Sequence, residues 1–259
     1  MSNRTGIEWT NVTWNPITGC TQVSAGCDNC YALTLAHRLL RKHYLRRQPT
    51  KNTGANRNNP FAVRLWPERL TQPFRWRGRQ LVFVNSMSDL FHVEVPDAFV
   101  RAAFEVMLEA RQHTYQILTK RPSRMARFVR KHESIFPDGI VPSHIWLGTS
   151  VEDSRVAYRV DHLRNVPARV RFLSCEPLIG PLRLDLNGIQ WVIAGGESGI
   201  HHRALDLDWV RHLRDDCLRH GVPFFFKQIG GRTPKAGGRT LDGRTWSEYP
   251  IVRDVVLST

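Results

Sequence analysis

Short apolar runs alternate with amphipathic segments along most of the chain. The runs are rich in β-branched and aromatic residues, and they cover 81–85, 115–118, 144–148, 170–173, 190–194 and 222–226. A strand that is buried on both faces has such a nearly continuous apolar run, which is typical of a parallel sheet. The pattern therefore predicts six parallel strands.

The segments between the runs show the helical period. Asp97 can cap one helix and Asp208 another, because an aspartate before a helix accepts N–H groups of the first turn. The apolar faces of these two helices consist of Phe99, Ala103, Met107 and Ala110, and of Trp209, Leu213 and Cys217. Residues 155–163 repeat the pattern, and residues 32–45 also read as a helix.

Alternating β and α units require right-handed crossovers, so the sheet is either open and doubly wound or curled towards a barrel. Polar, glycine-rich or charged residues follow every predicted strand. In a barrel the carboxyl ends of all strands ring one mouth, whereas an open sheet gathers its chemistry at one switch point. We therefore expect an α/β fold, a partial or complete (β/α) barrel of mostly parallel strands. One domain covers residues 1–259, with a basic insertion at about 48–80 and a first strand within 7–15.

Composition indicates the cellular setting. The chain has 259 residues, of which 41% are hydrophobic, as in ordinary globular proteins. No apolar run approaches the roughly 20 residues that a membrane span requires, and the first residues lack the apolar region of a signal peptide. We expect a cytoplasmic protein with no membrane partner, in a compartment that keeps thiols reduced.

The chain is strongly basic, with a net charge of +14 and a pI near 10.3. The positive residues cluster in three segments, 41–57, 75–79 and 120–131. Clusters of this kind favour contact with polyanions such as nucleic acid. The alternative is a set of solvated basic faces, and the sequence leaves both open.

Three of the five cysteines, Cys20, Cys27 and Cys30, lie on one short segment with the spacing C-x6-C-x2-C. Clustered cysteines in a reducing compartment are most often metal ligands. Three thiolates suit a [4Fe–4S] cluster that keeps one iron open. The alternatives are a zinc site completed by His37 or His43 and a redox use of the last two cysteines.

A resemblance to a known family rests on an ordered set of motifs: WNPITGCTQVSAGCDNCYA, NSMSDLFH, ILTKRP, GTSVED, FLSCEPL, AGGESG and FFFKQIGG. Nearly end to end, the chain resembles an uncharacterised phage and bacterial family that is usually described as radical S-adenosylmethionine-like. The resemblance implies that three cysteines on the loop after the first barrel strand hold a [4Fe–4S] cluster. It also implies that the open iron binds S-adenosylmethionine, which one electron cleaves to a 5′-deoxyadenosyl radical.

The cysteine spacing differs from that of most radical enzymes of this class, which have C-x3-C-x2-C with an aromatic residue before the last cysteine. Here six residues separate the first two cysteines, and Asn29 takes the aromatic position. This difference leaves the predicted cluster unchanged. It concerns whether the cluster cleaves S-adenosylmethionine in the usual reductive way or in a variant of it.

The strand ends supply candidate residues for the cofactor. Ser88 and Asp89 lie where such barrels bind the amino group of methionine, and a carboxylate suits an ammonium group. Lys120, with the adjacent arginine, suits a carboxylate or a phosphate. Ser150 and Glu152 suit ribose hydroxyls or a charged substrate group. The alternative for the first pair is a helix cap.

Later strands supply candidates that face the substrate. Glu176, Glu197 and Lys227 are expected to bind it or to move protons, with a buried ion-pair network as the alternative. The glycines of AGGESG are expected to allow a close backbone approach to a ligand or a positive φ. Cys175 and Cys217 are expected in the core.

Together these features predict a radical S-adenosylmethionine-type enzyme that acts on a nucleic acid or a nucleotide-derived substrate and receives electrons from a donor protein or molecule. Two alternatives remain. One is a radical enzyme that acts on a small-molecule precursor, and the other is a non-catalytic, zinc-stabilised nucleic-acid-binding protein.

Overall fold

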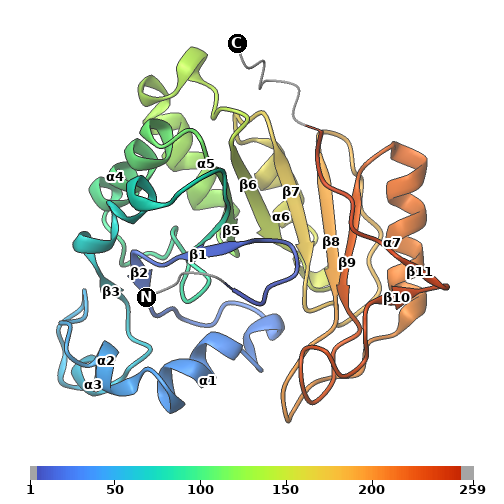
Figure 1. The fold of residues 1–259 in the computed structure, drawn as a ribbon, viewed down its shortest axis with the longest axis horizontal. Helices are drawn as coiled ribbons and strands as arrows, with labels where there is room; N and C mark the ends of the chain where they lie inside the picture. The colour runs from blue at the N-terminus through green and yellow to red at the C-terminus, as the bar shows by residue number, and fades with distance from the viewer. Residues whose placement is uncertain (1–4, 252–259) are drawn as a thin grey trace.

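All six predicted strands are present in the computed structural model, which describes residues 5–251, and a further strand precedes them. In sheet order they are β1 (Val12–Trp14), β4 (Leu81–Val84), β5 (Thr114–Thr119), β6 (Ile145–Ser150), β7 (Arg171–Cys175), β8 (Trp191–Gly195) and β9 (Phe224–Gln228). Every neighbouring pair is parallel. β1 and β9 form the two edges, and the sheet curls into a half-barrel (Figure 1). The predicted partial barrel and the position of its first strand are confirmed.

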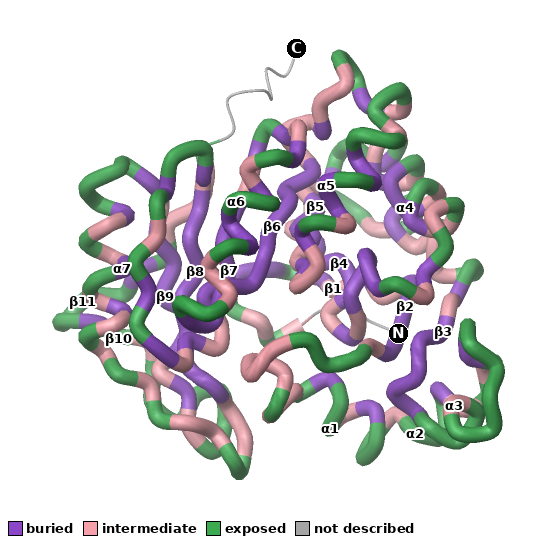
Figure 2. The backbone as a smooth tube through the Cα atoms, turned by 180° about the vertical axis from the view of Figure 1, so that it is seen from behind, coloured by how far each residue is buried: buried purple, intermediate pink, exposed green. Residues whose placement is uncertain are grey.

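Helices cover the outer face of the sheet. They are α4 (Asp97–Glu109), α5 (Pro122–Lys131), α6 (Arg159–Arg164) and α7 (Leu207–His220), which follow β4, β5, β6 and β8 (Figure 1). Alternate strand residues such as Val82, Ile117 and Val192 join the large core beneath these helices. The strands form the buried layer of the molecule in Figure 2. This alternation follows from the two-residue period of a strand.

The inner face of the half-barrel has its own aromatic core. Its members are Trp9, Phe83, Trp146, Val170, Phe172, Trp191, Ile193 and Phe225. Trp191 is a central member, with its ring centroid 5.5 Å from those of Trp146 and Phe172. These residues fill the interior, so polar side chains collect above them, at the carboxyl ends of the strands.

Two predicted helix caps are wrong. Asp206 caps α7, since its side chain accepts the backbone N–H of Asp208 at 2.9 Å. Asp97 is already the first residue of α4, and its carboxylate pairs with Arg124 and Lys131 instead. In both places several acidic residues lie near the helix start, and the three-dimensional contacts select among them.

The helix predicted at 32–45 is divided into α1 (Tyr31–Arg38) and α2 (Arg41–Tyr44). Leu39, between them, is 75% exposed, whereas Ala36 and Tyr44 are buried together in a small separate core. The helix predicted at 155–163 consists of a 3-10 turn, η6 (Ser154–Val156), followed by α6.

The basic insertion at 48–80 is joined to the cysteine segment. It contains α3 (Gly54–Asn58), β3 (Arg64–Leu65), η2 (Pro67–Arg69) and η3 (Gln72–Arg75). β3 pairs antiparallel with β2 (Ile17–Thr18), and the N–H of Cys20 donates to the carbonyl of Phe61 at 3.1 Å. The remaining short elements are η1 (Ala25–Cys27), η4 (Glu133–Ile135), η5 (Pro137–Gly139), β10 (Thr240–Leu241) and β11 (Arg244–Thr245).

None of the helices within residues 5–251 has the length and apolar character that crossing a bilayer requires.

Gly148 tests the packing of the inner aromatic core. A Cβ atom at Gly148 would lie 2.5 Å from carbons of the Phe172 ring, and overpacking a core costs about 1–3 kcal/mol. Gly148→Ala should therefore lower the free energy of unfolding by about that amount in urea denaturation. The control is Gly54→Ala on α3, where the nearest heavy atom is 3.9 Å away, and it should leave stability unchanged or slightly raised. Equal stability of the two variants would contradict the packing described here.

Candidate functional site

The three clustered cysteines lie at the carboxyl end of the parallel sheet, on the segment that leads from β2 to α1 (Figure 1). Cys27 ends the turn η1, and Cys30 directly precedes α1. All three thiols are free and partly exposed. Residues 20–30 are hereafter the cysteine loop.

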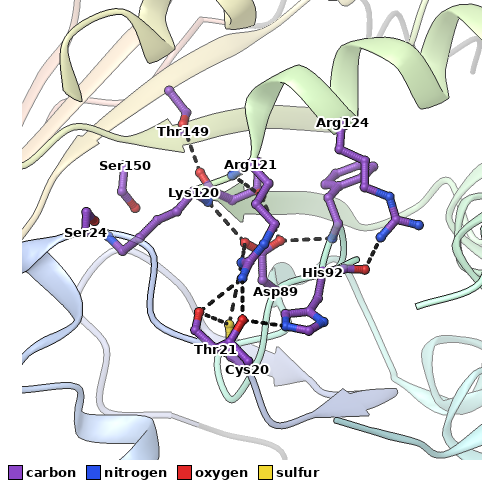
Figure 3. Close-up of polar contacts among 12 residues, drawn as sticks. Cys20, Thr21, Ser24, Asp89, His92, Lys120, Arg121, Arg124, Thr149 and Ser150 are labelled. Atoms are coloured by element: carbon purple, nitrogen blue, oxygen red, sulfur yellow. Dashed lines mark hydrogen bonds and ion pairs between the residues drawn. The ribbon is translucent and has the colours of Figure 1, made fainter. Parts of the chain in front are cut away.

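Arg121, held by Asp89, binds the first end of the cysteine loop (Figure 3). Arg121 follows β5, and its Nη1 donates to Asp89 Oδ2 at 2.8 Å. The same nitrogen lies 3.6 Å from Cys20 Sγ, and Nη2 donates to the carbonyl of Thr21 at 3.0 Å. One guanidinium therefore connects a buried strand-end carboxylate with the first of the clustered thiols.

Asp89 has a full set of hydrogen-bond donors around it. Besides the arginine, it accepts bonds from Thr119 Oγ1 at 2.7 Å and from the backbone N–H groups of Phe91 and Lys120 at 2.9 and 3.2 Å. Binding the ammonium group of a cofactor, as predicted, would require Asp89 to exchange one of these partners. Ser88, the other residue predicted for this role, donates its hydroxyl to the carbonyl of Ile17 at 2.9 Å.

His92 supports the same end of the loop. Its Nδ1 accepts the N–H of Glu94 at 3.2 Å, so Nε2 carries the proton and donates to Thr21 Oγ1, 2.8 Å away. Burial and the charge of Arg121 lower the pKa of His92, which keeps the ring neutral. His92 was not predicted as a site residue, although this histidine is the last residue of the motif NSMSDLFH.

Glu152, after β6, holds the middle of the cysteine loop. It is 1% exposed and accepts the hydroxyl of Ser24 at 3.0 Å, while Lys120 and Arg159 pair with its two oxygens. A Cβ atom at Gly26 would lie 2.4 Å from Glu152 Cγ, so glycine is what allows the loop to come this close. Burial alone would raise the pKa of Glu152, but Lys120 and Arg159 bring it below its usual value.

Glu197, after β8, holds the last part of the loop. It is 7% exposed and accepts the side-chain amide of Asn29 at 2.9 Å. Arg203 bonds to the same carboxylate at 2.5 Å and to the carbonyl of Ala25 at 2.8 Å. Burial would raise the pKa of Glu197, whereas the bonds from Arg203 and Asn29 lower it. Asn29, in the position that is usually aromatic, therefore attaches the loop to the sheet.

Glu176 and Lys227 form a separate ion pair at the ends of β7 and β9, with Lys227 Nζ donating to Glu176 Oε1. Their side chains are 16% and 17% exposed. Gly195 lies between them, since a Cβ atom there would be 3.4 Å from Lys227 Cβ and 3.6 Å from Glu176 Cδ. The structure thus brings together two residues that were predicted to face the substrate.

Tyr31 stands between the cysteine loop and this ion pair. The residue is 48% exposed, and its hydroxyl donates to the carbonyl of Ser86 at 2.5 Å. Loss of hydration is the largest factor that raises the pKa of Tyr31, followed by the charges of Cys30 and Glu176. Tyr31 was not predicted as a site residue, because its exposure beside a thiol is a property of the folded chain.

Two thiols of the cysteine loop, those of Cys20 and Cys30, have raised pKa values and carry their protons. Burial is the main factor that raises the pKa of Cys20 to about 11, with Asp89 adding to the effect and Arg121 opposing it. Burial also raises the pKa of Cys30. Metal binding would displace these protons. Within residues 5–251, no three His, Cys, Asp or Glu side chains converge closely enough to hold a metal ion.

The two histidines considered as zinc ligands are engaged or lie away from the loop. His43 stacks on Trp66, with centroids 4.9 Å apart and an interplanar angle of 9°, and it lies 2.8 Å from Arg69 Nη2. His37 is exposed on α1.

Asn85, directly after β4, is buried without a polar partner. It is 2% exposed, has a positive φ of 61°, and neither side-chain polar atom bonds to anything among the described residues. An unpaired buried polar group costs about 1–3 kcal/mol, and strained residues of this kind concentrate at functional sites. Asn85 was not predicted as a site residue, although this asparagine is the first residue of the motif NSMSDLFH.

The remaining predicted positions divide between the site and the core. Ser150 is 3% exposed at the end of β6, and its carbonyl accepts Arg159 Nη1 at 3.0 Å. Cys175 and Cys217 are fully buried in the large core, as predicted. A Cβ atom at Gly196 would lie 1.9 Å from the carbonyl oxygen of Ile229, so this glycine allows a close approach to the chain's own backbone. Gly199 has a φ of 126°, which confirms the positive φ predicted for AGGESG.

The chain belongs to the DUF5131 family, described as a protein of unknown function, and the family model matches residues 4–250. No curated protein and no solved structure matches it. The chemistry of the site is therefore argued from its residues.

Glu197→Gln should loosen the last part of the cysteine loop. The carboxylate is nearly buried, but its partner Arg203 is 35% exposed. We therefore expect the free energy of unfolding to fall by about 1–3 kcal/mol. Hydrogen exchange, read by mass spectrometry on peptides covering residues 20–30, should become faster.

The matched control is Glu105→Gln, which breaks an exposed ion pair with Arg101. It should lower the free energy of unfolding by at most about 1 kcal/mol. Exchange in the cysteine loop should stay unchanged in this control. Equal loop exchange in the two variants would show that Glu197 does not hold the loop.

Proposed function

We propose that this chain is a cytoplasmic radical S-adenosylmethionine-type enzyme that carries a [4Fe–4S] cluster and modifies a nucleic acid or a nucleotide-derived substrate. The observation that carries the proposal is the docking of one three-thiol loop onto the carboxyl ends of β4, β6 and β8, through Asp89, Glu152 and Glu197. The strand ends of a (β/α) barrel converge on one mouth. A group held by the loop would therefore face the residues that end the other strands.

Cys20, Cys27 and Cys30 would hold the cluster. When bound and reduced, such a cluster supplies the electron for cleavage of S-adenosylmethionine, and an external electron donor must restore it. Arg121 points an N–H group at Cys20 Sγ, 3.6 Å away. Hydrogen bonds to ligating sulfurs are among the factors that set a cluster's reduction potential, which gives Arg121 a positioning and tuning role.

Residues at the ends of β4, β5 and β6 would bind S-adenosylmethionine. Lys120 follows β5, the strand between the other two, and its ammonium suits the carboxylate of the methionine part. Ser150 and Asn85 are buried at the ends of the flanking strands. They offer a hydroxyl and an unpaired amide to the hydroxyl groups or the base of the nucleoside part.

Glu176 and Lys227 would serve the substrate. Glu152 and Glu197 bond directly to the cysteine loop and Asp89 reaches it through Arg121, whereas this pair makes no hydrogen bond to the loop in the described part of the chain. A lysine that donates to a carboxylate holds a proton at Nζ, which it can share with a substrate atom placed within hydrogen-bond distance. The pair is therefore available for chemistry rather than for docking the loop.

Charge and an exposed aromatic ring favour a nucleic-acid substrate. The net charge is +14, and the exposed Tyr31 directly follows Cys30, where a base could stack on it. A zinc-stabilised binding protein is less well supported because His43, a candidate fourth ligand, is engaged with Trp66 and Arg69.

Iron and sulfide analysis tests the cluster. Anaerobically reconstituted protein should contain about four iron and four sulfide ions per chain, and Cys20→Ala should lose most of both. Cys217→Ala is the control, since this thiol is on the buried face of α7 and its loss should leave the iron content unchanged. Stoichiometric zinc without sulfide in the wild-type protein would refute the proposal.

Tyr31→Ala tests the substrate class. Losing one stacked base contact should weaken binding of a single-stranded oligonucleotide by about 1–3 kcal/mol, measured by fluorescence anisotropy at low salt. Tyr31→Phe keeps the ring and removes only the hydroxyl bond to Ser86, so it should bind like the wild type. If the alanine and phenylalanine variants bind equally well, no base stacks there and the small-molecule alternative gains support.

A further inference from the structure

We propose that a second, separate site, formed by residues 43–48 and by Trp66 of the basic insertion, binds a phosphate group of the nucleic-acid backbone. The site is a hollow lined by His43, Arg46, Arg47, Gln48 and Trp66. This inference goes beyond the strand-end chemistry and rests on the proposed nucleic-acid substrate.

Trp66 forms a rigid base for the hollow. It is 5% exposed, and its indole N–H donates to Thr18 Oγ1 at 2.9 Å, which fixes the ring. The guanidinium carbons of Arg69 and Arg47 lie 4.0 and 4.9 Å from the ring centroid. Stacking on an aromatic ring orders a guanidinium while leaving its N–H groups at the ring edge.

Positive charge in and around the hollow exceeds the negative charge. Arg47 pairs with Glu68, whose side chain is 55% exposed. Arg46 is exposed, and its guanidinium makes no hydrogen bond or ion pair within residues 5–251; the same is true of the Gln48 amide. A free guanidinium beside a free amide matches the oxygen atoms of a phosphate, because both groups present N–H donors and guanidinium binds phosphate with two parallel bonds.

His43 completes the donor set as a neutral ring. Its Nε2 lies 2.8 Å from Arg69 Nη2, which can only donate, so the proton of the neutral imidazole is on Nδ1. Burial, Arg69 and Arg46 lower the pKa of His43, and Glu68 opposes them. A nearby phosphate would offset the positive charge that these arginines leave in the hollow.

The hollow adjoins the outer side of the cysteine loop. Trp66 belongs to the small core that also includes Ala32, Ala36 and Met87, and both Cys20 and Cys30 pack against this core. A nucleic-acid strand with one phosphate in the hollow could therefore pass over α1 towards the strand ends. The site would hold the strand while a nucleotide further along reaches the mouth.

The experiment is a salt titration of single-stranded oligonucleotide binding by wild-type protein, Arg46→Gln and Arg111→Gln. Each variant removes one exposed arginine that has no hydrogen-bond or ion-pair partner in the described chain, but Arg111 lies just before β5, at the opposite end of the sheet. One lost phosphate contact reduces the slope of log affinity against log salt by about 0.7 for single strands. Arg46→Gln should show this reduction and Arg111→Gln should not. Thermal unfolding of both variants confirms that they are folded.

If the wild type binds and the two variants have equal slopes, the phosphate site is refuted while the proposed enzyme function stands. If the wild type binds no oligonucleotide at low salt, the nucleic-acid substrate fails, and inorganic phosphate then tests the hollow directly. A phosphate-dependent shift of the His43 ring signals in NMR that is absent in Arg46→Gln supports a phosphate site. No shift in the wild type refutes it.

Discussion

Three buried carboxylates at the carboxyl end of the half-barrel sheet have to be neutralised, and the rest of the site depends on this requirement. Asp89, Glu152 and Glu197 end alternate strands of the sheet and are 5%, 1% and 7% exposed. A buried ion that lacks partners loses several kcal/mol of hydration. Each carboxylate is therefore paired with a cation, and the groups that complete its surroundings attach the cysteine loop at its start, middle and end. The same contacts therefore neutralise the buried carboxylates and fix the position of the cysteine loop.

The same requirement separates residues that hold the site from residues that are free to react. Arg121, Arg159 and Arg203 are committed to strand-end carboxylates. The pair of Glu176 and Lys227 makes no hydrogen bond to the cysteine loop within residues 5–251, and for this reason we propose that it serves the substrate. The basic segments divide in the same way. Several cations of 120–131 pair with carboxylates of the protein, whereas the guanidinium of Arg46, in the segment 41–57, has no hydrogen-bond or ion-pair partner within residues 5–251. Net charge alone therefore overstates how much of the surface is available to a polyanion.

Much of the fold could be predicted from the sequence, because strands buried on both faces produce apolar runs and β/α alternation leaves few topologies. The predicted helix caps were wrong where two acidic residues lie close together in the sequence. At α7, for example, Asp206 caps the helix in place of the predicted Asp208. The site was predicted at the level of which residues gather at the strand ends. Their partners were not predicted, since the contact of Asn29 with Glu197 spans most of the chain and no local pattern encodes it. Asn85 and Tyr31 were missed because burial without a partner and exposure beside a thiol are properties of the folded chain.

The central claim is that the cysteine loop holds a [4Fe–4S] cluster with three thiolates and leaves one iron open to S-adenosylmethionine. The most direct measurement is the electron paramagnetic resonance spectrum of the reduced, anaerobically reconstituted protein with and without S-adenosylmethionine. The account predicts that the cofactor changes the g-values and line shape, because it becomes a ligand of the open iron. An identical spectrum at saturating S-adenosylmethionine would contradict it.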